Sequence, residues 1–369
     1  MNFKSLGIKP EMVVTLKKMG LTEPTPIQAQ SIPLIMHGKD IIGQAHTGTG
    51  KTLAFLLPII EQLSPSHPHV QALILSPTRE LALQITEIAK ALASVYHLGV
   101  LPVYGGQDTS AQIKKLTKGV QIVIATPGRL LDHLGRGTIQ LNAVKTFVLD
   151  EADQMLLMGF KNEVEMITQK LPKKRQTLCF SATMDAHVKK MAYRYTKSPV
   201  TISIEKSKFT LDAISQEVVE TTDRLKQASL FKVLNEDHPY MAIIFCRTKR
   251  RVEDLYAAMH REGYNCIRLH SDILQSKRER MMKSFRSGDI QYLIATDVAA
   301  RGIDVSGMTH VYNYDCPETP ESYVHRIGRT GRAGENGYTC LFVTPKNTEE
   351  LIAIEKKLKK TLKRRKLQD

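Results

Sequence analysis

The stretch AHTGTGKT, Ala45–Thr52, decides the fold of this 369-residue chain. It follows an apolar run and matches the phosphate-binding loop of nucleotide-binding proteins, with Ala in place of the usual first Gly. Glycines let backbone N–H groups wrap phosphate oxygens, Lys51 reaches the β and γ phosphates, and the Thr52 hydroxyl coordinates magnesium. We therefore expect a strand, this loop and a helix, with a nucleotide held by Ala45, His46, Thr47, Gly48, Thr49, Gly50, Lys51 and Thr52.

A cluster of acids follows a second apolar run, Phe147–Leu149, in the stretch FVLDEADQMLLMGF. A phosphate-loop enzyme needs a carboxylate at a neighbouring strand end to hold magnesium, and a second group to orient the attacking water. Asp150 suits the metal, together with Thr52, and Glu151 suits the water. The alternative is an ordinary strand end that emerges into water with acids on its exit loop.

The third acid of this cluster, Asp153, has a different expected role. The segment SAT, which begins at Ser181 and ends at Thr183, closes the next predicted strand. We expect Asp153 to accept a hydrogen bond from Thr183 or Ser181 and so to hold neighbouring elements together.

Short apolar runs alternate with longer amphipathic patterns along the whole chain. Strands that are apolar on both faces and alternate with helices indicate parallel sheets covered by helices on both sides. We expect an α/β protein with two such sheets in two domains, with helices such as Glu80–Leu92 and Val252–Arg261 between the strands. The predicted strands are Asp40–Gln44, Ala72–Ser76, Val100–Tyr104, Gln121–Ala125, Thr146–Asp150, Thr177–Ser181, Met241–Cys246, Cys266–His270, Gln291–Ala295, His310–Tyr314 and Thr339–Val343.

The domain boundary is expected near Glu205–Ala213, EKSKFTLDA, where the alternation lapses. We predict a first domain over residues 1–205, a short mobile linker over 206–213, a second domain over 214–354 and a basic tail over 355–369. The tail holds eight Lys or Arg residues and two acids. Such a charge run suits contact with nucleic acid, or else a solubilising frayed helix end.

Two pairs of segments resemble each other, although we do not expect the halves to repeat overall. QIVIATPGR, Gln121–Arg129, resembles QYLIATDVAAR, Gln291–Arg301, and LSPTRELA, Leu75–Ala82, resembles IFCRTKRRVEDL, Ile244–Leu255. Carboxyl ends of parallel strands share one rim, so these four strand ends offer hydroxyls, N–H groups and guanidinium groups to a line of phosphates. The alternative at each strand end is ordinary helix capping by threonine.

The segment HRIGRTGR, His325–Arg332, spaces Arg326, Arg329 and Arg332 three residues apart. This spacing predicts three guanidinium groups on one face of a helix. Gly328 and Gly331 weaken a simple solvated basic helix, and arginine stabilises the charge of a transferring phosphoryl group. Because these arginines belong to the second predicted domain and the phosphate loop to the first, we expect the nucleotide between the two domains. Hydrolysis would then require closure of the cleft between them.

A further segment, LTEPTPIQ, Leu21–Gln28, precedes the phosphate loop. The amide of Gln28 can donate to adenine N7 and accept from N6, and Phe3 can stack on the base. The alternative is a Pro-Thr-Pro turn with Gln28 at the start of a helix.

The bulk composition narrows the function classes. A net charge of +15 suits an anionic partner. The five cysteines form no CxxC pair, which argues against a zinc site or a disulfide framework and fits a reducing compartment. The longest apolar stretch, Leu53–Ile60, contains a proline and is far shorter than the roughly 20 residues of a membrane span. We expect a cytoplasmic protein without membrane contact.

Taken together, these motifs resemble the DEAD-box family of ATP-dependent RNA helicases, as a minimal, bacterial-type core with a short basic C-terminal tail. The resemblance runs from Phe3 to Arg332 in the family's order. The motifs that carry it are PTPIQ, AHTGTGKT, PTRELA, Gly105-Gly106, TPGR, DEAD at Asp150–Asp153, SAT, IFCRT, QSKR at Gln275–Arg278, ATDVAARGID and HRIGRTGR.

The resemblance implies two RecA-like domains of the phosphate-loop NTPase type, with ATP and Mg²⁺ in the cleft and RNA across both. It implies that Phe3 and Gln28 read adenine, that Asp304 touches the ribose, and that Lys51, Thr52, Asp150 and Glu151 bind and activate Mg-ATP. Arg329 and Arg332 are then arginine fingers, and His325 links the domains near Asp153. The implied contacts to the RNA backbone are Thr78, Arg79, Gly106, Thr126, Arg129, Arg247, Arg278 and Thr296.

The function implied is RNA-stimulated ATP hydrolysis coupled to local unwinding of short RNA duplexes or remodelling of RNA–protein complexes, by a monomer with weak sequence selectivity. ATP and RNA each bridge both domains in this scheme, so each raises the affinity for the other. Two alternatives stay open at this point. One is a DNA-directed motor, and the other is an ATP-dependent RNA clamp that recruits partners and unwinds little.

Overall fold

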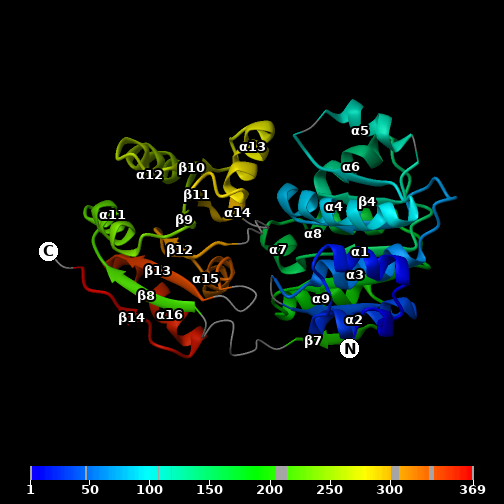
Figure 1. The fold of residues 1–369 in the computed structure, drawn as a ribbon, viewed down its shortest axis with the longest axis horizontal. Coiled ribbons are helices and arrows are strands. Elements are labelled where there is room, and N and C mark those ends of the chain that lie inside the picture. Colours follow the sequence, from blue (N-terminus) through cyan, green and yellow to red (C-terminus); the bar gives the residue numbers. More distant parts are fainter. Residues whose placement is uncertain are drawn as a thin grey trace. The chain divides into compact units, whose positions relative to one another are not determined.

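The structure is a computed structural model, and the residues that it describes are 2–45, 48–106, 108–117, 119–204, 214–300, 307–331 and 336–367. The chain forms two compact units, Met1–Lys206 and Ser207–Asp369. We call them unit 1 and unit 2 and treat each by itself; their elements can be followed by colour in Figure 1. The linker that we expected at 206–213 lies outside the described residues.

Unit 1 is built on a parallel sheet of seven strands in the order β3-β4-β2-β5-β6-β1-β7. Because all the strands run the same way, their carboxyl ends form a single edge of the sheet. The strands are β1 Ile41–Gln44, β2 Ala72–Leu75, β3 Val100–Val103, β4 Ile122–Ala125, β5 Thr146–Leu149, β6 Gln176–Ser181 and β7 Val200–Ser203.

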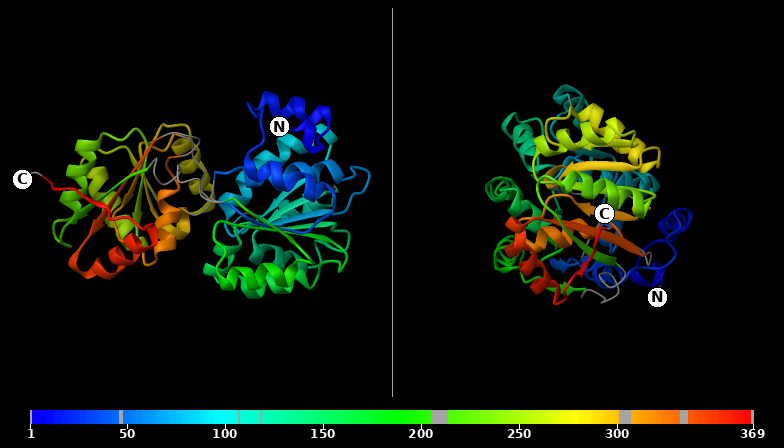
Figure 2. Two further views of the ribbon diagram at one scale, coloured as in Figure 1. Left: turned by 90° about the horizontal axis from the view of Figure 1, so that it is seen from below. Right: turned by 90° about the vertical axis from the view of Figure 1, so that its left-hand side faces the viewer.

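Helices cover both faces of this sheet, as Figure 2 shows. Successive residues of a strand point to opposite faces, so Ile74 packs in one core and its neighbours Leu73 and Leu75 pack in another. The first core takes residues of α1 to α4 and the second takes residues of α6 to α9. The helices are α1 Pro10–Lys18, α2 Pro26–Met36, α3 Lys51–Gln62, α4 Arg79–Ala93, α5 Thr109–Leu116, α6 Pro127–Gly135, α7 Ala152–Leu157, α8 Lys161–Thr168 and α9 Ala186–Tyr195, with 3-10 turns η1 Lys4–Leu6 and η2 Ser94–Tyr96.

Unit 2 also holds a parallel seven-stranded sheet, in the order β10-β11-β9-β12-β13-β8-β14. Its strands are β8 Ile214–Glu220, β9 Ala242–Cys246, β10 Cys266–Leu269, β11 Tyr292–Thr296, β12 His310–Asn313, β13 Gly337–Val343 and β14 Lys363–Arg364. Its helices are α11 Lys226–Asp237, α12 Lys249–Arg261, α13 Gln275–Arg286, α14 Asp297–Ala300, α15 Pro320–Ile327 and α16 Thr348–Leu358, with the 3-10 turn η3 Pro345–Asn347.

The two sheets have the same strand order when the strands of each unit are numbered from its own first strand. Our expectation that the halves do not repeat is therefore wrong at the level of topology. The fold class itself is confirmed, and each of the eleven predicted strands is found within two residues of its predicted bounds. Three strands were missed, β7, β8 and β14. β7 and β14 each pair with one strand only, at an edge of the sheet, and their short runs carry weak apolar periodicity.

The segment that we expected to be a separate basic tail is part of unit 2. Helix α16 extends to Leu358, Leu362 is buried, and β14 pairs with β8. Arg365 donates to Asp237 Oδ1 at 2.7 Å and to Glu236 Oε2 at 2.5 Å, and Lys363 Nζ lies 2.6 Å from Glu217 Oε1. The described part of the predicted basic tail therefore packs on unit 2, and acids of unit 2 pair with part of its charge.

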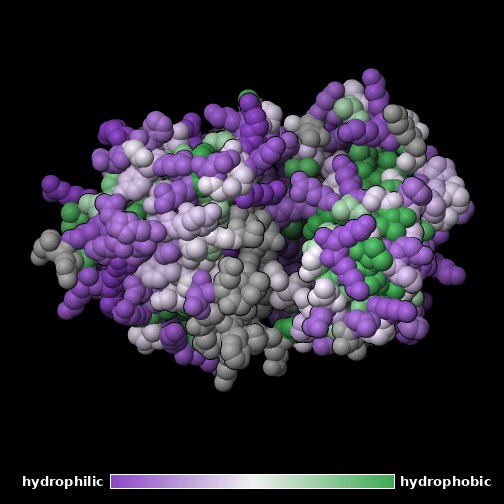
Figure 3. Space-filling model, in the orientation of Figure 1, coloured by the Kyte–Doolittle hydropathy of each residue, from purple (hydrophilic) through white to green (hydrophobic). Residues whose placement is uncertain are grey.

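On the face drawn in Figure 3, hydrophilic side chains predominate and apolar side chains gather in limited patches. No helix in the described part of the chain combines the length and the apolar character needed to cross a bilayer.

Candidate functional site

The phosphate loop leaves the carboxyl end of β1 and leads into α3, whose first residue is Lys51. Gly48 and Gly50 have φ angles of 84° and 91°, in the left-handed region that a residue with a Cβ adopts only at a cost. The Lys51 ammonium is buried and donates to the carbonyl of Ala45 at 2.7 Å. The lysine therefore closes the loop on itself at the helix N-terminus. His46 and Thr47 lie outside the described residues.

Gln28 joins this loop to the segment that precedes it. Its Oε1 accepts from the backbone N–H of Thr25 at 3.0 Å, and its Nε2 donates to the carbonyl of Gly50 at 3.0 Å. With the Thr25 hydroxyl facing the helix, these contacts form a capping box at the start of α2. The helix-start interpretation of Gln28 is therefore correct, and the same amide also contacts the phosphate loop. The Gln28 side chain is itself 2% exposed, so in the structure its amide serves these two contacts and is closed to solvent.

Phe3 does not have the position that we expected. Its side chain is 2% exposed and packs in the core with residues of α1 and α3. A base needs an open ring face for stacking, and this ring offers none in the structure. The sequence could not separate the two roles, because an aromatic residue near the N-terminus suits a core as well as a stacking platform.

The carboxylate of Asp150 follows the last residue of β5 and is 3% exposed. Burial raises its pKa to about 7, against the opposing attraction of Lys51, and repulsion from Glu151 adds to the increase. Its Oδ1 accepts from the backbone N–H of Glu151 at 3.0 Å. A buried carboxyl that is this poorly compensated by its surroundings suits a site that a cation completes.

The donor set fits magnesium rather than a softer metal. Among the residues that the structure describes, no cluster of three or more His, Cys, Asp or Glu side chains is arranged to hold a metal. Magnesium is usually held by one or two protein oxygens together with water and substrate phosphates. Asp150 and the hydroxyl of Thr52, the second residue of α3, supply oxygens of this kind.

Glu151 stands at the turn between β5 and α7 with φ 51° and ψ 53°. A non-glycine residue in this left-handed region carries backbone strain, and such strain is concentrated at functional sites. The side chain is 7% exposed. The turn holds the carboxylate beside Asp150 and away from bulk water, so the ordinary solvent-exposed exit loop is excluded for this acid.

Asp153 connects α7 to the segment that follows β6. Its Oδ2 accepts from both the backbone N–H and the hydroxyl of Thr183, at 3.0 Å and 2.9 Å. Its own backbone N–H donates to the Ser181 hydroxyl at 3.2 Å. All three residues that we expected to touch are thus in contact within unit 1. These bonds join the acidic turn directly to the segment that contains Thr183.

The expected RNA-contact residues of unit 1 follow the carboxyl ends of neighbouring strands. Thr78 caps α4 by accepting from the N–H of Leu81, and Thr126 precedes the first turn of α6. A Cβ built on Gly105 would lie 3.1 Å from the Arg79 guanidinium, so the arginine lies directly against the backbone of the glycine pair. Threonine capping is therefore present at Thr78, as the alternative interpretation held, and Gly106 at φ 86° completes the turn.

A buried network that sequence reasoning missed lies under this edge. His133 is fully buried, with one ring nitrogen 2.9 Å from Gln112 Oε1 and the other 2.8 Å from the Thr138 hydroxyl. Gln112 in turn donates to the carbonyl of Tyr104 at 3.2 Å. Burial lowers the pKa of His133, so the ring stays neutral near pH 7. The network supports the turn at Gly105 from beneath, and Arg129 on the same helix donates to the Thr109 hydroxyl.

In unit 2, two of the expected RNA-contact residues meet at one place. Arg278 in α13 donates to the carbonyl of Ala299 at 2.7 Å, and the Thr296 hydroxyl at the end of β11 accepts from the N–H of Ala299 at 3.4 Å. Both side chains are nearly buried. The short helix α14 is thus held between α13 and the carboxyl edge of the sheet.

The arginine segment differs from our expectation of three guanidinium groups on one face. Arg326 points into unit 2, where it forms two 2.6 Å hydrogen bonds to Asp297 and further bonds to Asn313 Oδ1 and the carbonyl of Asp315. Helix α15 ends at Ile327, so Arg329 lies beyond it, and it is 5% exposed. His325 is half-buried. Arg332 and Asp304 lie outside the described residues.

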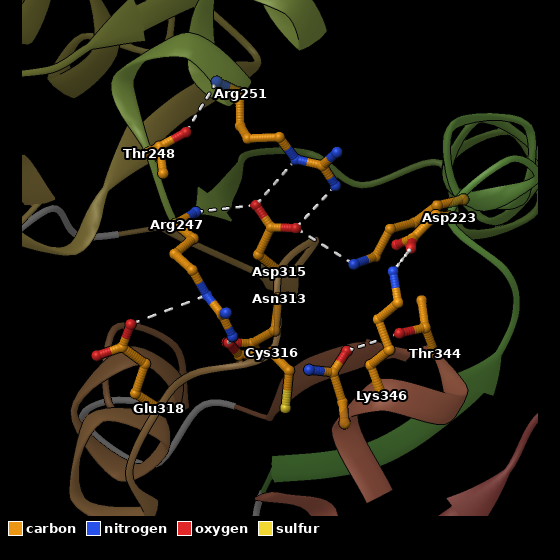
Figure 4. Close-up of polar contacts among 12 residues, drawn as sticks. Asp223, Arg247, Thr248, Arg251, Asn313, Asp315, Cys316, Glu318, Thr344 and Lys346 are labelled. Atoms are coloured by element: carbon orange, nitrogen blue, oxygen red, sulfur yellow. Dashed lines mark hydrogen bonds and ion pairs between the residues drawn. The ribbon is translucent and has the colours of Figure 1, made fainter.

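Arg247 follows β9 at the same edge of unit 2. Its backbone N–H donates to Asp315 Oδ2 at 2.9 Å, and its Nη2 donates to the carbonyl of Cys316 at 3.1 Å (Figure 4). Asp315 also binds Arg251 and Lys226, and neither residue was singled out from the sequence. The signal for Lys226 would have been its place at the start of the helix after β8, a strand that we did not predict.

Comparisons with known proteins agree with this geometry. The sequence model of the family described as DEAD/DEAH box helicase matches residues 25–191, and that of the helicase conserved C-terminal domain matches residues 225–334. The DEAD-box ATP-dependent RNA helicase CshA of Bacillus subtilis is 47% identical over 364 residues, which span 99% of this chain and 74% of that protein. The ATP-dependent RNA helicase CshA of Listeria monocytogenes is 48% identical over 360 residues, 98% of this chain and 69% of that protein.

Two solved structures are similar over almost the whole chain. Dbp5 of S. cerevisiae bound to RNA and ADP BeF3 has a TM-score of 0.91 at 33% identity, covering 99% of this chain and 95% of its own. The DEAD-box helicase Mss116 bound to ssRNA and UDP-BeF has a TM-score of 0.91 at 31% identity, covering 100% of this chain and 81% of its own.

Proposed function

Because this chain belongs to the DEAD-box family of ATP-dependent RNA helicases, we propose that RNA stimulates its ATP hydrolysis and that hydrolysis drives local unwinding of short RNA duplexes or remodelling of RNA–protein complexes. The observation that carries the proposal is the pairing of the phosphate loop with the buried Asp150 at one edge of the unit 1 sheet. Nucleotides bind at this edge in α/β proteins.

We assign the chemistry within unit 1 as follows. Gly48, Thr49 and Gly50 offer backbone N–H groups to phosphate oxygens, and Lys51 exchanges its bond to the Ala45 carbonyl for the β and γ phosphates. Thr52 and Asp150 would hold Mg²⁺, which supplies charge neutralisation when bound. Glu151, held by its strained turn, orients the attacking water and accepts its proton.

Residues of unit 2 complete this reaction in our proposal. Arg329 and Arg332 stabilise the charge that develops on the phosphoryl group. His325 and Asp153 carry the coupling between the units, and Asp304 contacts the ribose. Asp153 is supported in this role by its two bonds to Thr183, which join the acidic turn to a second segment at the same edge.

The RNA is bound through its backbone in this proposal. Thr78, Arg79, Gly106, Thr126 and Arg129 of unit 1, and Arg247, Arg278 and Thr296 of unit 2, follow strand ends or flank them. Contacts of this kind recognise phosphate and 2′-hydroxyl groups and give weak sequence selectivity. We further propose a cytoplasmic location, since all five cysteines are free and buried, and a monomeric state, as the resemblance to the family implies.

The test is ATP turnover by the full chain with and without single-stranded RNA, beside the variant Glu151→Gln. We expect RNA to raise turnover, and the variant to bind ATP but lose turnover by on the order of 10²–10⁴-fold, the usual contribution of a general base. Glu11→Gln, an exposed acid on α1, is the matched control and should behave as wild type. Turnover that is equal with and without RNA contradicts the coupling.

Two further arms separate the alternatives. Equal stimulation by single-stranded DNA of the same length would contradict selection of RNA. Stable RNA binding with a non-hydrolysable ATP analogue, together with no loss of a short duplex during ATP hydrolysis, would favour a clamp over an unwinding enzyme.

A further inference from the structure

Unit 2 has side chains at the positions that correspond to the nucleotide site of unit 1. The strand order is the same in both sheets, so β8, β9 and β12 take the places of β1, β2 and β5. The helix after the first strand begins at Lys51 in unit 1 and at Lys226 in unit 2. Likewise, β5 is followed by Asp150 and β12 is followed, after one residue, by Asp315. A lysine therefore recurs at the corresponding helix start, and an acid recurs after the corresponding strand with an offset of one residue.

The contacts of these residues are different in unit 2. Asp315 Oδ1 lies 3.2 Å from Lys226 Nζ and 2.9 Å from Arg251 Nη2, and its Oδ2 accepts from Arg251 Nε at 3.3 Å (Figure 4). The backbone N–H of Arg247 adds a bond of 2.9 Å to Oδ2. A lysine at a helix start, an arginine fork and a backbone N–H at a strand end are the donors that proteins use to bind a phosphate.

The donors surround the carboxylate so fully that it remains charged. The side chains of Lys226 and Asp315 are 4% and 10% exposed. Burial opposes ionisation of Asp315, yet the bonds from Arg251 and the N–H of Arg247, with the attraction of Lys226, leave its pKa below the ordinary value. Tyr314 packs against the two cations, with Lys226 Nζ 5.4 Å and the Arg251 guanidinium carbon 5.1 Å from the ring centre.

We infer that Asp315 is a built-in anion, which occupies in unit 2 a set of donors of the kind that binds a phosphate and thereby positions Arg247. The carboxylate fixes the backbone of Arg247, and the carbonyl of the next residue, Cys316, fixes its guanidinium. The side chain of Arg247 remains 43% exposed between these two anchors. That the positioned group then contacts RNA rests on the proposed function, whereas the built-in anion does not.

The first experiment tests the anion without RNA. Asp315→Ala removes the carboxylate and leaves Lys226, Arg251 and the N–H of Arg247 facing an empty place. We expect inorganic phosphate to raise the melting temperature of this variant in the full chain by about 3 °C more than it raises that of the wild type. Sodium chloride of equal ionic strength serves as the baseline, and the wild type accounts for phosphate bound at the loop of unit 1.

Two variants sharpen this result. Asp223→Ala removes an exposed acid that pairs with Lys346 at 2.8 Å nearby, and it should show no gain from phosphate over the wild type. Asp315→Ala combined with Lys226→Met should lose the gain. If phosphate stabilises Asp315→Ala no more than the wild type, or if the lysine is not needed, the inference is wrong.

The second experiment uses Asp315→Asn, which keeps the shape of the side chain and so also serves if the alanine variant does not fold. The logarithm of the affinity for single-stranded RNA is measured against the logarithm of salt concentration, with a non-hydrolysable ATP analogue. This slope is negative, and we expect its magnitude to decrease by about 0.7, the value of one phosphate contact on a single strand. Arg247→Ala should have the same effect, and the double variant should show no further loss.

The outcomes separate the two proposals. Additive losses from Asp315→Asn and Arg247→Ala would overturn the positioning role of Asp315. Absence of RNA binding by the wild type would contradict the proposed function, while the phosphate experiment would still decide whether Asp315 is a built-in anion.

Discussion

Arg326 and Asp297 form a two-pronged ion pair inside unit 2, with Nε–Oδ1 and Nη2–Oδ2 distances of 2.6 Å. The pair joins the end of β11 to α15, two segments that belong to different sequence motifs. Asp297 directly follows Thr296 at the end of β11, and Arg326 lies in the last turn of α15, three residues before Arg329. A contact at the strand end is therefore mechanically connected to the arginine segment.

Asp297→Asn should destabilise the protein, because it leaves the Arg326 guanidinium, which is 3% exposed, without its counter-charge. Loss of one partner of a fully buried ion pair typically costs about 3–5 kcal/mol of unfolding free energy. Because the Asp297 side chain is 30% exposed, we expect a loss at the lower end of that range. Urea unfolding followed by circular dichroism measures the change. The control is Asp132→Asn, which removes the exposed partner of Arg136 at 2.7 Å and should leave stability almost unchanged. Similar losses in the two variants would contradict the importance of burial.

Gly50→Ala should abolish nucleotide binding. The residue has φ 91°, and a Cβ there would lie 2.4 Å from Gln28 Nε2 and 3.0 Å from the Thr25 hydroxyl. Gly7→Ala is the control, since Gly7 has φ 92° but open space around its Cβ position. Each variant carries left-handed strain of about 1–2 kcal/mol, so their melting temperatures should both fall. Binding of a fluorescent ATP analogue should be lost only with Gly50→Ala. Equal binding by both variants would show that nucleotide binding does not need the close packing of Gly50 against Gln28.

Arg365→Met should destabilise unit 2, although it lies in the segment that we predicted to be a basic tail. Arg365 Nη1 lies 2.7 Å from Asp237 Oδ1 and 3.6 Å from Glu217 Oε2, and both acids are about one-tenth exposed. Removing the arginine takes the cation from Asp237, which among the described residues keeps only the hydroxyl of Tyr312, while Glu217 still pairs with Lys363. We expect a cost of about 3 kcal/mol in unfolding free energy, the lower end for a broken buried pair. Lys366→Met, a change of an exposed neighbour, should have little effect. If the two variants lose RNA affinity equally and neither loses stability, the segment is a tail after all.

Stability should depend on acid through Asp315. Its folded-state pKa lies below the ordinary value, so the carboxylate contributes stability above about pH 4, the unfolded pKa of an aspartate. That contribution is lost as the pH falls through the lower, folded pKa. The wild type should therefore be more stable than Asp315→Asn at pH 7, and the difference should shrink below pH 4. Urea unfolding at both pH values checks this, and a difference that grows in acid would reverse the sign of the argument.

The sequence by itself determined the local chemistry of this protein. The phosphate loop needs only a few consecutive residues between a strand and a helix, and the acidic turn after β5 needs only Asp150 and Glu151 at a strand end. Contiguous spacing and apolar periodicity report such features, because both arise from backbone geometry over a few residues. The α/β class and the eleven strands with clear apolar runs were predictable for the same reason.

Only the tertiary structure decided which distant residues meet. Lys363 pairs with Glu217 across 146 positions, Lys226 pairs with Asp315 across 89, and Arg326 turns inward to Asp297. The burial of Phe3 and the equal strand order of the two units belong to this group as well. Such outcomes depend on how sheets and helices pack, and packing joins residues whose separation in sequence carries no periodic signal.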